Sequence, residues 1–301
     1  MVKITGLKEA VEDVNVFLLS AIFMGLMFPS FSYQLRLLTN AFLITMMTLS
    51  MRTISFRALK IRENLRQIAL TVSINYGFLS FIVIFLSLLL IGEASFFKGF
   101  IVMAAAPPAI LIVAFCYIFK GNVELALTTE IVSYLSSLIV TPTLILLFFG
   151  SAIDVLYMVQ TLFLLIILPM ILSRFLTGKS RVFDYSKLII NACIGLNIYT
   201  VIGLNQPTIT SSFFSLLPMI VIAVIRTYGT CFIVYFGLKM LNVNLRDRIT
   251  YALFASLKNL AFAAIMSLSL FGEKAALPSS IAIMFEASIP IFMSFLISRV
   301  R

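Results

Sequence analysis

Ten apolar stretches follow one another along the chain, separated by short polar connections. They cover 14–30, 34–51, 66–92, 95–119, 122–149, 153–176, 186–204, 212–238, 249–271 and 275–298. Each is near or above the ~20 residues that an α-helix needs to span a bilayer. The pattern therefore predicts an all-α membrane protein with ten transmembrane helices.

Composition strengthens this prediction. The chain is 61% hydrophobic and only 11% charged, whereas soluble domains are about 45–50% apolar and about 25% charged. Its net charge of +10 raises the question of nucleic-acid binding. The basic residues, however, lie in short clusters between apolar stretches, which is typical of topology signals and not of a nucleic-acid surface.

The basic clusters also predict an orientation. Most of them fall on one side of the membrane if the chain crosses ten times with both termini in the cytoplasm, as the positive-inside rule requires. These clusters lie in 52–66, 174–187, 239–248 and the C-terminal end, and the opposite side carries only Arg36, Lys98 and Lys274. The first stretch lacks a cleavage site and is expected to be a retained helix. We expect an integral protein of a plasma or inner membrane.

A weak internal repeat divides the chain into halves of about 1–150 and 151–301. The segment 95–149 is similar to 248–299 after a shift of 151 residues, which places Pro107-Pro108 on Lys258-Asn259. Five helices per half is an odd number, so the halves would have opposite orientations, as in many secondary transporters. The sequence thus predicts one unit, 1–301, with a five-plus-five inverted repeat.

The adjacent prolines Pro107 and Pro108 lie in the middle of the fourth stretch. Proline removes a backbone donor and clashes with the preceding turn, so two in a row should unwind the helix. Unwound backbone at membrane depth is tolerated only against protein or a water-filled cavity. We expect a break here, and a second one at the polar Lys258-Asn259.

Four charged residues fall near the middle of apolar stretches: Glu130, Arg226, Lys258 and Glu286. Each would cost about 2.5–3.5 kcal/mol at the bilayer centre if unpaired. Arg226 and Glu286 are predicted to form a structural ion pair. Lys258 and Glu130 are predicted to line a solute path or to relay protons, with a purely structural pair as the alternative. Further polar residues in these stretches are Asn75, Thr128, Thr129, Asn191, Asn197, Ser256 and Asn259.

Little in the sequence indicates catalysis or a cofactor. There is no His, and the three Cys lie in apolar runs without metal-ligand spacing, so zinc sites and most catalytic triads are excluded. No phosphate-binding loop of the GxxxxGK[ST] type occurs. Every Asp lies near the end of a stretch, which speaks against an intramembrane aspartyl protease. We predict that the protein is not an enzyme and carries no resident metal or cofactor.

Two stretches carry a resemblance to a known family. Pro107-Pro108 with Tyr117-Ile118-Phe119-Lys120-Gly121-Asn122 is similar to a Pro-Gly-Gly…Tyr-Leu-Ala-Lys-Gly-Asp stretch, and Lys258–Ala263 with Ala275–Pro278 is similar to a Gln-Asn-Ser-Gly-Leu-Ala…Ala-Ala-Leu-Pro stretch. On these residues the chain resembles the bile acid:sodium symporter family, within the bile/arsenite/riboflavin transporter group. The resemblance implies discontinuous, crossing helices 4 and 9, a panel of helices 1, 2, 6 and 7, and a core of helices 3–5 and 8–10. Substrate would enter between panel and core by alternating access.

The chain departs from this family where sodium would bind. Relatives have Ser-Asn at Ile112-Val113 and a Glu at Phe254, and these replacements offer no side-chain oxygen for a hard cation. Lys258 replaces a Gln, Glu130 replaces a Thr, Asn75 falls near a Gln, and Asn259 is retained. We therefore predict a Lys258–Glu130 ion pair in place of sodium, with Asn75 nearby. The carrier would be sodium-independent, either proton-coupled or passive.

The resemblance also implies a small organic solute, chiefly an organic anion, as substrate. The residues predicted to meet it or to form the crossing are Pro107, Pro108, Lys258, Asn259, Glu286 and Asn197. Glu286 replaces a His and would repel an anion unless protonated or paired with Arg226. The alternatives are a proton-coupled antiporter or auxin-carrier-like transporter, and a non-transporting receptor on the same scaffold. The predicted protein is a monomer or homodimer in the lipid bilayer and does not bind nucleic acid.

Overall fold

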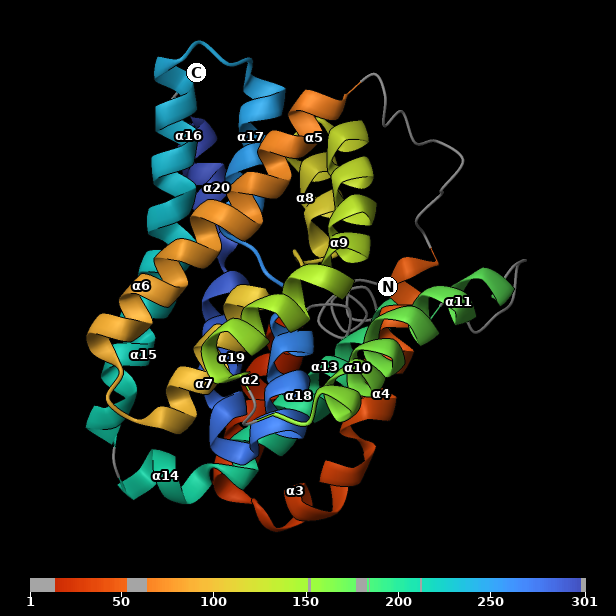
Figure 1. Cartoon of the computed structure of the whole chain (residues 1–301), viewed down its shortest axis with the longest axis vertical. Coiled ribbons are helices and arrows are strands. Elements are labelled where there is room, and N and C mark those ends of the chain that lie inside the picture. Colours follow the sequence, from red (N-terminus) through yellow and green to blue (C-terminus); the bar gives the residue numbers. More distant parts are fainter. Residues whose placement is uncertain are drawn as a thin grey trace, which may run out of the picture.

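The computed structural model describes residues 14–52, 64–150, 153–176, 183, 185–211 and 213–298. Within these ranges the regular elements are helices, and the only extended pairing is an isolated antiparallel β-bridge between Pro108 and Lys258. The predicted all-α class is confirmed (Figure 1).

The helices follow the predicted apolar stretches closely. The first half contains α2 (Val14–Met27), α3 (Ser30–Leu35), η1 (Arg36–Leu38), α4 (Thr39–Met51), α5 (Leu65–Val72), η3 (Ser73–Leu79), α6 (Ser80–Leu90), α7 (Ala94–Ala105), α8 (Leu111–Ile118) and α9 (Val123–Phe149). The second half contains α10 (Val155–Leu162), η5 (Phe163–Ile167), α11 (Leu168–Phe175), α13 (Ser186–Leu204), α14 (Gln206–Ser211), α15 (Phe213–Val224), η6 (Ile225–Gly229), α16 (Thr230–Met240), α17 (Leu245–Phe254), α18 (Leu260–Phe271), α19 (Glu273–Glu286) and α20 (Ile289–Ser298). The segments η3, η5 and η6 are π-helical turns that continue the helices on either side.

Five of the described helices are long and apolar enough to cross a membrane, and the number rises to seven if two bent pairs each count as one span. One bent pair, Val16–Met27 with Ser30–Met51, turns by 112° near Pro29; the other, Glu273–Glu286 with Ile289–Ser298, turns by 40°. The interrupted helices fall below the length criterion because each half is short. Ten crossings in an inverted repeat therefore stays a prediction.

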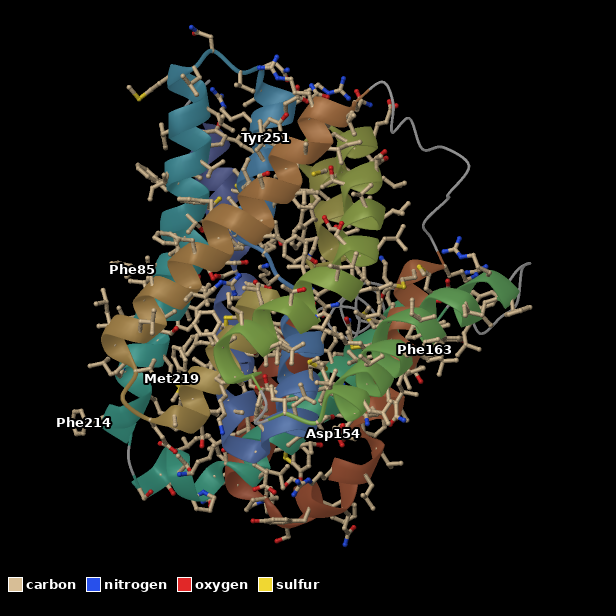
Figure 2. The ribbon with its side chains drawn as sticks, viewed as in Figure 1. Phe85, Asp154, Phe163, Phe214, Met219 and Tyr251 are labelled. Atoms are coloured by element: carbon tan, nitrogen blue, oxygen red, sulfur yellow. The ribbon has the colours of Figure 1, made fainter. Side chains whose placement is uncertain are left out.

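The pattern of burial differs from that of a soluble protein, because charged side chains are buried and large apolar side chains are exposed. Arg226, Lys258 and Glu130 are completely buried, whereas Phe214 is 86% exposed. Figure 2 shows Phe85, Phe163 and Phe214 pointing away from the bundle. The interior is largely apolar but also holds charged side chains, and the exterior is apolar. An apolar exterior of this kind is stable in lipid, because water would penalise the exposed surface.

Two helices are interrupted at the positions that the sequence predicts. The first interruption separates α7 from α8, between Ala105 and Leu111, and the second separates α17 from α18, between Phe254 and Leu260. Ala106, which precedes Pro107, has an extended backbone with ψ 149°. Proline disfavours the helical conformation in the residue before it, so Pro107 and Pro108 together end α7.

The helices pack in two sets of neighbours. In one set, α13 packs against α2, α3 and α4, and α4 packs against α11. In the other, α7 packs against α18 and α19, while α5, α8, α9, α16 and α17 lie next to one another (top of Figure 1). The interrupted helices belong to the second set, so the crossing residues that the sequence singles out lie inside it.

Candidate functional site

The two interruptions cross each other at the centre of the second set. The backbone N–H of Asn259 donates to the carbonyl oxygen of Pro107 at 2.7 Å, beside the Pro108–Lys258 bridge. Each interruption therefore supplies hydrogen-bond partners for the other. Unwound backbone inside a membrane protein requires such internal partners.

The carbonyl groups at the end of α7 are satisfied by side chains from three other segments. Ser80 Oγ donates to Ala104 O at 2.6 Å, and Thr141 Oγ1 donates to Ala105 O at 2.8 Å. Lys258 Nζ donates to Ala104 O and to Ala106 O, both at 2.9 Å. The last carbonyls of a helix carry partial negative charge, so the end of α7 is a natural place for a cation.

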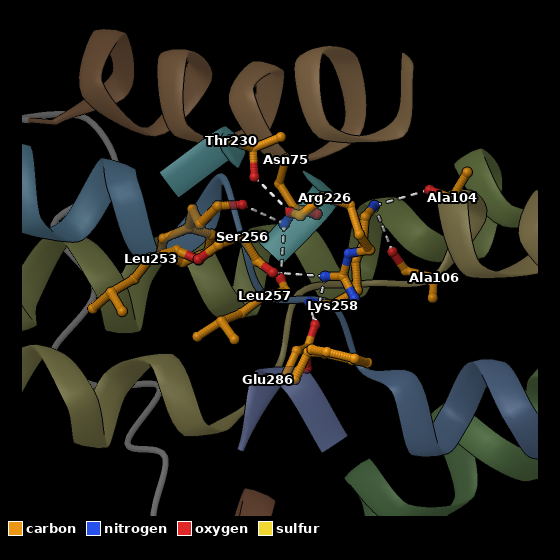
Figure 3. A network of polar contacts seen from close by, with 12 residues as sticks. Asn75, Ala104, Ala106, Arg226, Thr230, Leu253, Ser256, Leu257, Lys258 and Glu286 are labelled. Carbon is orange, nitrogen blue, oxygen red and sulfur yellow. Dashed lines mark hydrogen bonds and ion pairs between the residues drawn. The ribbon is translucent and has the colours of Figure 1, made fainter. Parts of the chain in front are cut away.

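Lys258 meets this negative end with its whole ammonium group. Besides Ala104 O and Ala106 O, Nζ donates to Ser80 Oγ at 3.1 Å, so three acceptors match the three N–H groups of an ammonium. The face of the Tyr76 ring lies 4.5 Å from Nζ and adds a cation–π contact. Figure 3 shows Lys258 reaching from the second interruption to Ala104 in the last turn of α7 and to Ala106 in the first interruption.

The carbonyl end of α17 is satisfied in a similar way. Asn75 Nδ2 donates to Phe254 O at 2.7 Å and to Leu257 O at 3.1 Å. Arg226 Nη2 donates to Ser256 O at 2.6 Å. Asn75 thus fixes the second interruption from the π-helical segment η3.

Arg226 and Glu286 form a buried ion pair with an Nη2–Oε1 distance of 2.5 Å. The same carboxylate oxygen accepts from the backbone N–H of Lys258 at 2.9 Å. The predicted Arg226–Glu286 pair is present, and it holds η6, α19 and the second interruption together (Figure 3). Whether its role is purely structural stays a prediction.

The predicted Lys258–Glu130 ion pair is wrong for this structure. Lys258 Nζ is occupied by the oxygens at the end of α7, and neither carboxylate oxygen of the fully buried Glu130 has a hydrogen-bond partner among the described residues. The two groups share Tyr76 as a neighbour: its ring contacts Nζ, and Glu130 interacts with it electrostatically. The sequence could not reveal that backbone carbonyls would hold the ammonium.

Asn259 connects the crossing to α4. Its side-chain oxygen caps α18 by accepting from Phe262 N at 3.0 Å, and its Nδ2 donates to Tyr134 Oη at 2.7 Å and to Met47 Sδ at 3.2 Å. Met47 lies on α4, in the other set of helices. Asn197, on α13, is buried, but neither atom of its amide has a hydrogen-bond partner in the described part of the chain. The structure does not bring Asn197 into this network.

Sequence reasoning missed Tyr76, Ser80, Tyr134, Thr141 and Met47. Tyr76 and Ser80 are four residues apart, about one helical turn, so their spacing did indicate a polar helix face. Tyr134 and Thr141 are likewise two turns apart on α9. Met47 carried no signal, because a methionine in an apolar helix is ordinary core.

A comparison with known protein families identifies the family of this chain. The model of the SBF-like CPA transporter family matches residues 13–301. The chain belongs to this family. No protein of curated function matches the sequence. The predicted resemblance to the bile acid:sodium symporters is confirmed at the level of the family, and the protein is an integral membrane protein of a transporter family.

In this SBF-like chain, three of the positions that correspond by resemblance to sodium ligands, Ile112, Val113 and Phe254, offer no side-chain oxygen. Ile112 and Phe254 are fully buried in one apolar cluster with Cys116, Ala126 and Leu257, and Val113 packs against it. Sodium needs a shell of oxygen atoms, by analogy with other hard cations. An apolar cluster offers none, so we derive no step through a bound sodium ion.

Proposed function

We propose that the protein is a secondary transporter of small organic solutes in which the Lys258 ammonium takes the place of a coupling sodium ion. One observation carries the proposal: Nζ has three oxygen acceptors at the crossing, two of them backbone carbonyls at the end of α7 and the start of the first interruption. A tethered cation at this point supplies the positive charge that the helix end favours. It also leaves no need for sodium.

The proposal includes a ten-helix inverted repeat, in which the two interrupted helices are equivalent members of the two halves. The interruptions lie 151 residues apart in sequence and pair with each other through Pro108 and Lys258. Their proximity supports a pseudo-twofold relation between the halves. In this arrangement α2–α4, α10–α11 and α13 form the panel, the remaining long helices form the core, and both termini are cytoplasmic.

The buried charges support an anionic substrate. Arg226 and Glu286 neutralise each other at 2.5 Å, so Glu286 no longer opposes an anion. Lys258 remains as a cation with no carboxylate within salt-bridge distance among the described residues. A negative organic solute entering between panel and core would be attracted to it. Asn259, which reaches Met47 on the panel side, would contact the solute at the same level.

Glu130 is our candidate for proton coupling. Its carboxylate is completely buried, and the hydroxyl groups of Thr129 and Ser133 on the same helix also have no partner within the described ranges. A proton can bind such a carboxylate without breaking an existing hydrogen bond. Burial of an ionised carboxylate is costly, so a change of environment during transport would change its protonation.

The test is uptake into proteoliposomes of a labelled bile salt or 2-keto acid under a sodium gradient, a proton gradient, or neither. We expect proton-driven uptake that does not respond to sodium. Lys258→Ala should abolish uptake, since it removes the tethered cation. Glu130→Gln should abolish proton-driven accumulation and leave exchange between labelled and unlabelled solute.

Lys274→Gln serves as the matched control, since it removes a lysine and an ion pair at the surface. Its uptake should equal that of the unaltered protein. Sodium-driven uptake that survives the loss of both Lys258 and Glu130 would overturn the proposal. So would full proton-driven uptake by Lys258→Ala.

A further inference from the structure

Two neighbouring residues at the start of α19 form ion pairs with different parts of the molecule. Arg36 Nη1 donates to Glu273 Oε1 at 2.6 Å, and Lys274 Nζ donates to Glu93 Oε1 at 2.9 Å. The side chains are similarly accessible, at 47% and 30% in the first pair and 51% and 40% in the second. The pairs are thus chemically alike and differ in what they connect.

The Arg36–Glu273 pair connects the panel to the core. Arg36 lies in η1 between α3 and α4, and α3 is tightly joined to α13, because a Cβ atom on Gly203 would lie only 2.6 Å from Ser32 Oγ. Asn205, just after α13, donates its Nδ2 to the backbone oxygen of Glu273 at 2.9 Å. Two panel segments therefore hold the same residue of α19.

The Lys274–Glu93 pair connects two parts of the core helices, and it does not involve the panel. Glu93 directly precedes α7, which packs so closely on α19 that a Cβ atom on Gly99 would lie 2.1 Å from Ala275 O. The close packing of α7 on α19 makes these two helices neighbours that we expect to move together. Separation of panel from core would break the Arg36 pair and leave the Lys274 pair intact.

We propose that Arg36 and Glu273, with Asn205, form a gate that closes the extracytoplasmic side of the path between panel and core. This inference rests on the proposed transport function and on the topology in which Arg36 and Lys274 face outward. Exposed ion pairs contribute little to stability, so water can replace this one at small cost when the side opens. A gate of this kind biases the open–closed equilibrium without locking it.

The test is a distance between two spin labels across the gate. The positions are Leu37, which is exposed in η1, and Gly92, beside which a Cβ atom has open space. Both are changed to Cys in a protein whose three buried cysteines are replaced by serine. Pulsed electron paramagnetic resonance in lipid nanodiscs then gives the ratio of longer to shorter distances.

Arg36→Gln should raise that ratio about two- to fivefold, in line with the modest strength of an exposed pair. Glu273→Arg should raise it further, because it places two cations together. The charge-swapped double variant Arg36→Glu/Glu273→Arg should return it toward the original value. Lys274→Gln should leave the distance ratio unchanged, because the Lys274–Glu93 pair joins only core helices.

An unchanged ratio in both Arg36→Gln and Glu273→Arg would overturn the gate, as would an equal rise in Lys274→Gln. These outcomes can be separated from a failure of the transport proposal. If liposomes transport solute while the distances do not respond, the gate is wrong and the function stands. If the distances respond while no gradient drives uptake, the ion pair does control the separation of panel and core, and the transport proposal is wrong.

Discussion

The two interruptions that cross at the centre of the molecule contribute different hydrogen-bonding groups. The first, from Ala106 to Ile110, contributes backbone acceptors and has no polar side chain. The second, from Ala255 to Asn259, contributes Ser256, Lys258 and Asn259, with N–H donors on Lys258 and Asn259. Proline explains the difference, because a Pro-Pro sequence removes two donors and exposes the carbonyls before it. Toward each other, the first interruption therefore presents acceptors and the second presents donors.

This division indicates where substitutions should matter. Geometry in the first interruption depends on backbone conformation, which many sequences could adopt. Charge balance around the second interruption depends on individual buried side chains. We therefore expect side-chain changes around the second interruption to be more damaging than changes to the prolines of the first.

The largest effect on stability is expected for Glu286→Gln. The substitution leaves the buried Arg226 without a countercharge, and removing one partner of a buried ion pair typically costs about 3–5 kcal/mol. The free energy of unfolding in mixed micelles measures this loss. Glu93→Gln, which breaks an ion pair between partly exposed side chains, is the control and should cost at most about 1 kcal/mol. Equal losses in the two variants would show that the crossing charges are not energetically coupled.

A smaller loss is expected for Asn75→Ala. The amide nitrogen serves Phe254 O and Leu257 O, and a buried carbonyl left without a donor costs about 1–3 kcal/mol. The matched control is Asn197→Ala, which removes another buried amide that makes no hydrogen bond in the described structure. It should leave the free energy of unfolding nearly unchanged. Equal destabilisation by the two variants would contradict the role given to Asn75.

The smallest change should follow Pro108→Ala. The bond from Asn259 N goes to Pro107 O and does not require the Pro108 ring. The substitution mainly adds freedom to the unfolded chain, which corresponds to about 0.4–1 kcal/mol. The same unfolding experiment measures it. A loss as large as that of Glu286→Gln would reverse the order that we assign to the two interruptions.

Much of this architecture can be predicted from the sequence, because the signals are local. Long apolar runs define the helices, and Pro107-Pro108 defines one interruption through steric rules that act on neighbouring residues. The Arg226–Glu286 pair follows from the high cost of isolated charges in lipid. Apolar length alone, in contrast, does not establish ten crossings, because α7 and α18 are too short to count as spans by themselves.

The site is less predictable where backbone groups act as ligands. The sequence places Lys258 and Glu130 at similar depth, and opposite charges invite pairing. In the structure, the Lys258 ammonium instead donates hydrogen bonds to Ala104 O, Ala106 O and Ser80 Oγ. A carbonyl becomes an acceptor only because a helix ends there, and alanine side chains give no hint of it.

The central claim, that the Lys258 ammonium replaces a bound sodium ion, can be tested without knowing the substrate. A ligand that binds only the folded state raises the thermal unfolding midpoint as its concentration exceeds the dissociation constant. We would measure Tm of the purified protein in sodium chloride and in choline chloride at equal concentrations. The account predicts the same Tm in both salts over the whole range. A Tm that rises with sodium and not with choline would contradict it, because oxygens other than those at the crossing would then be binding the ion.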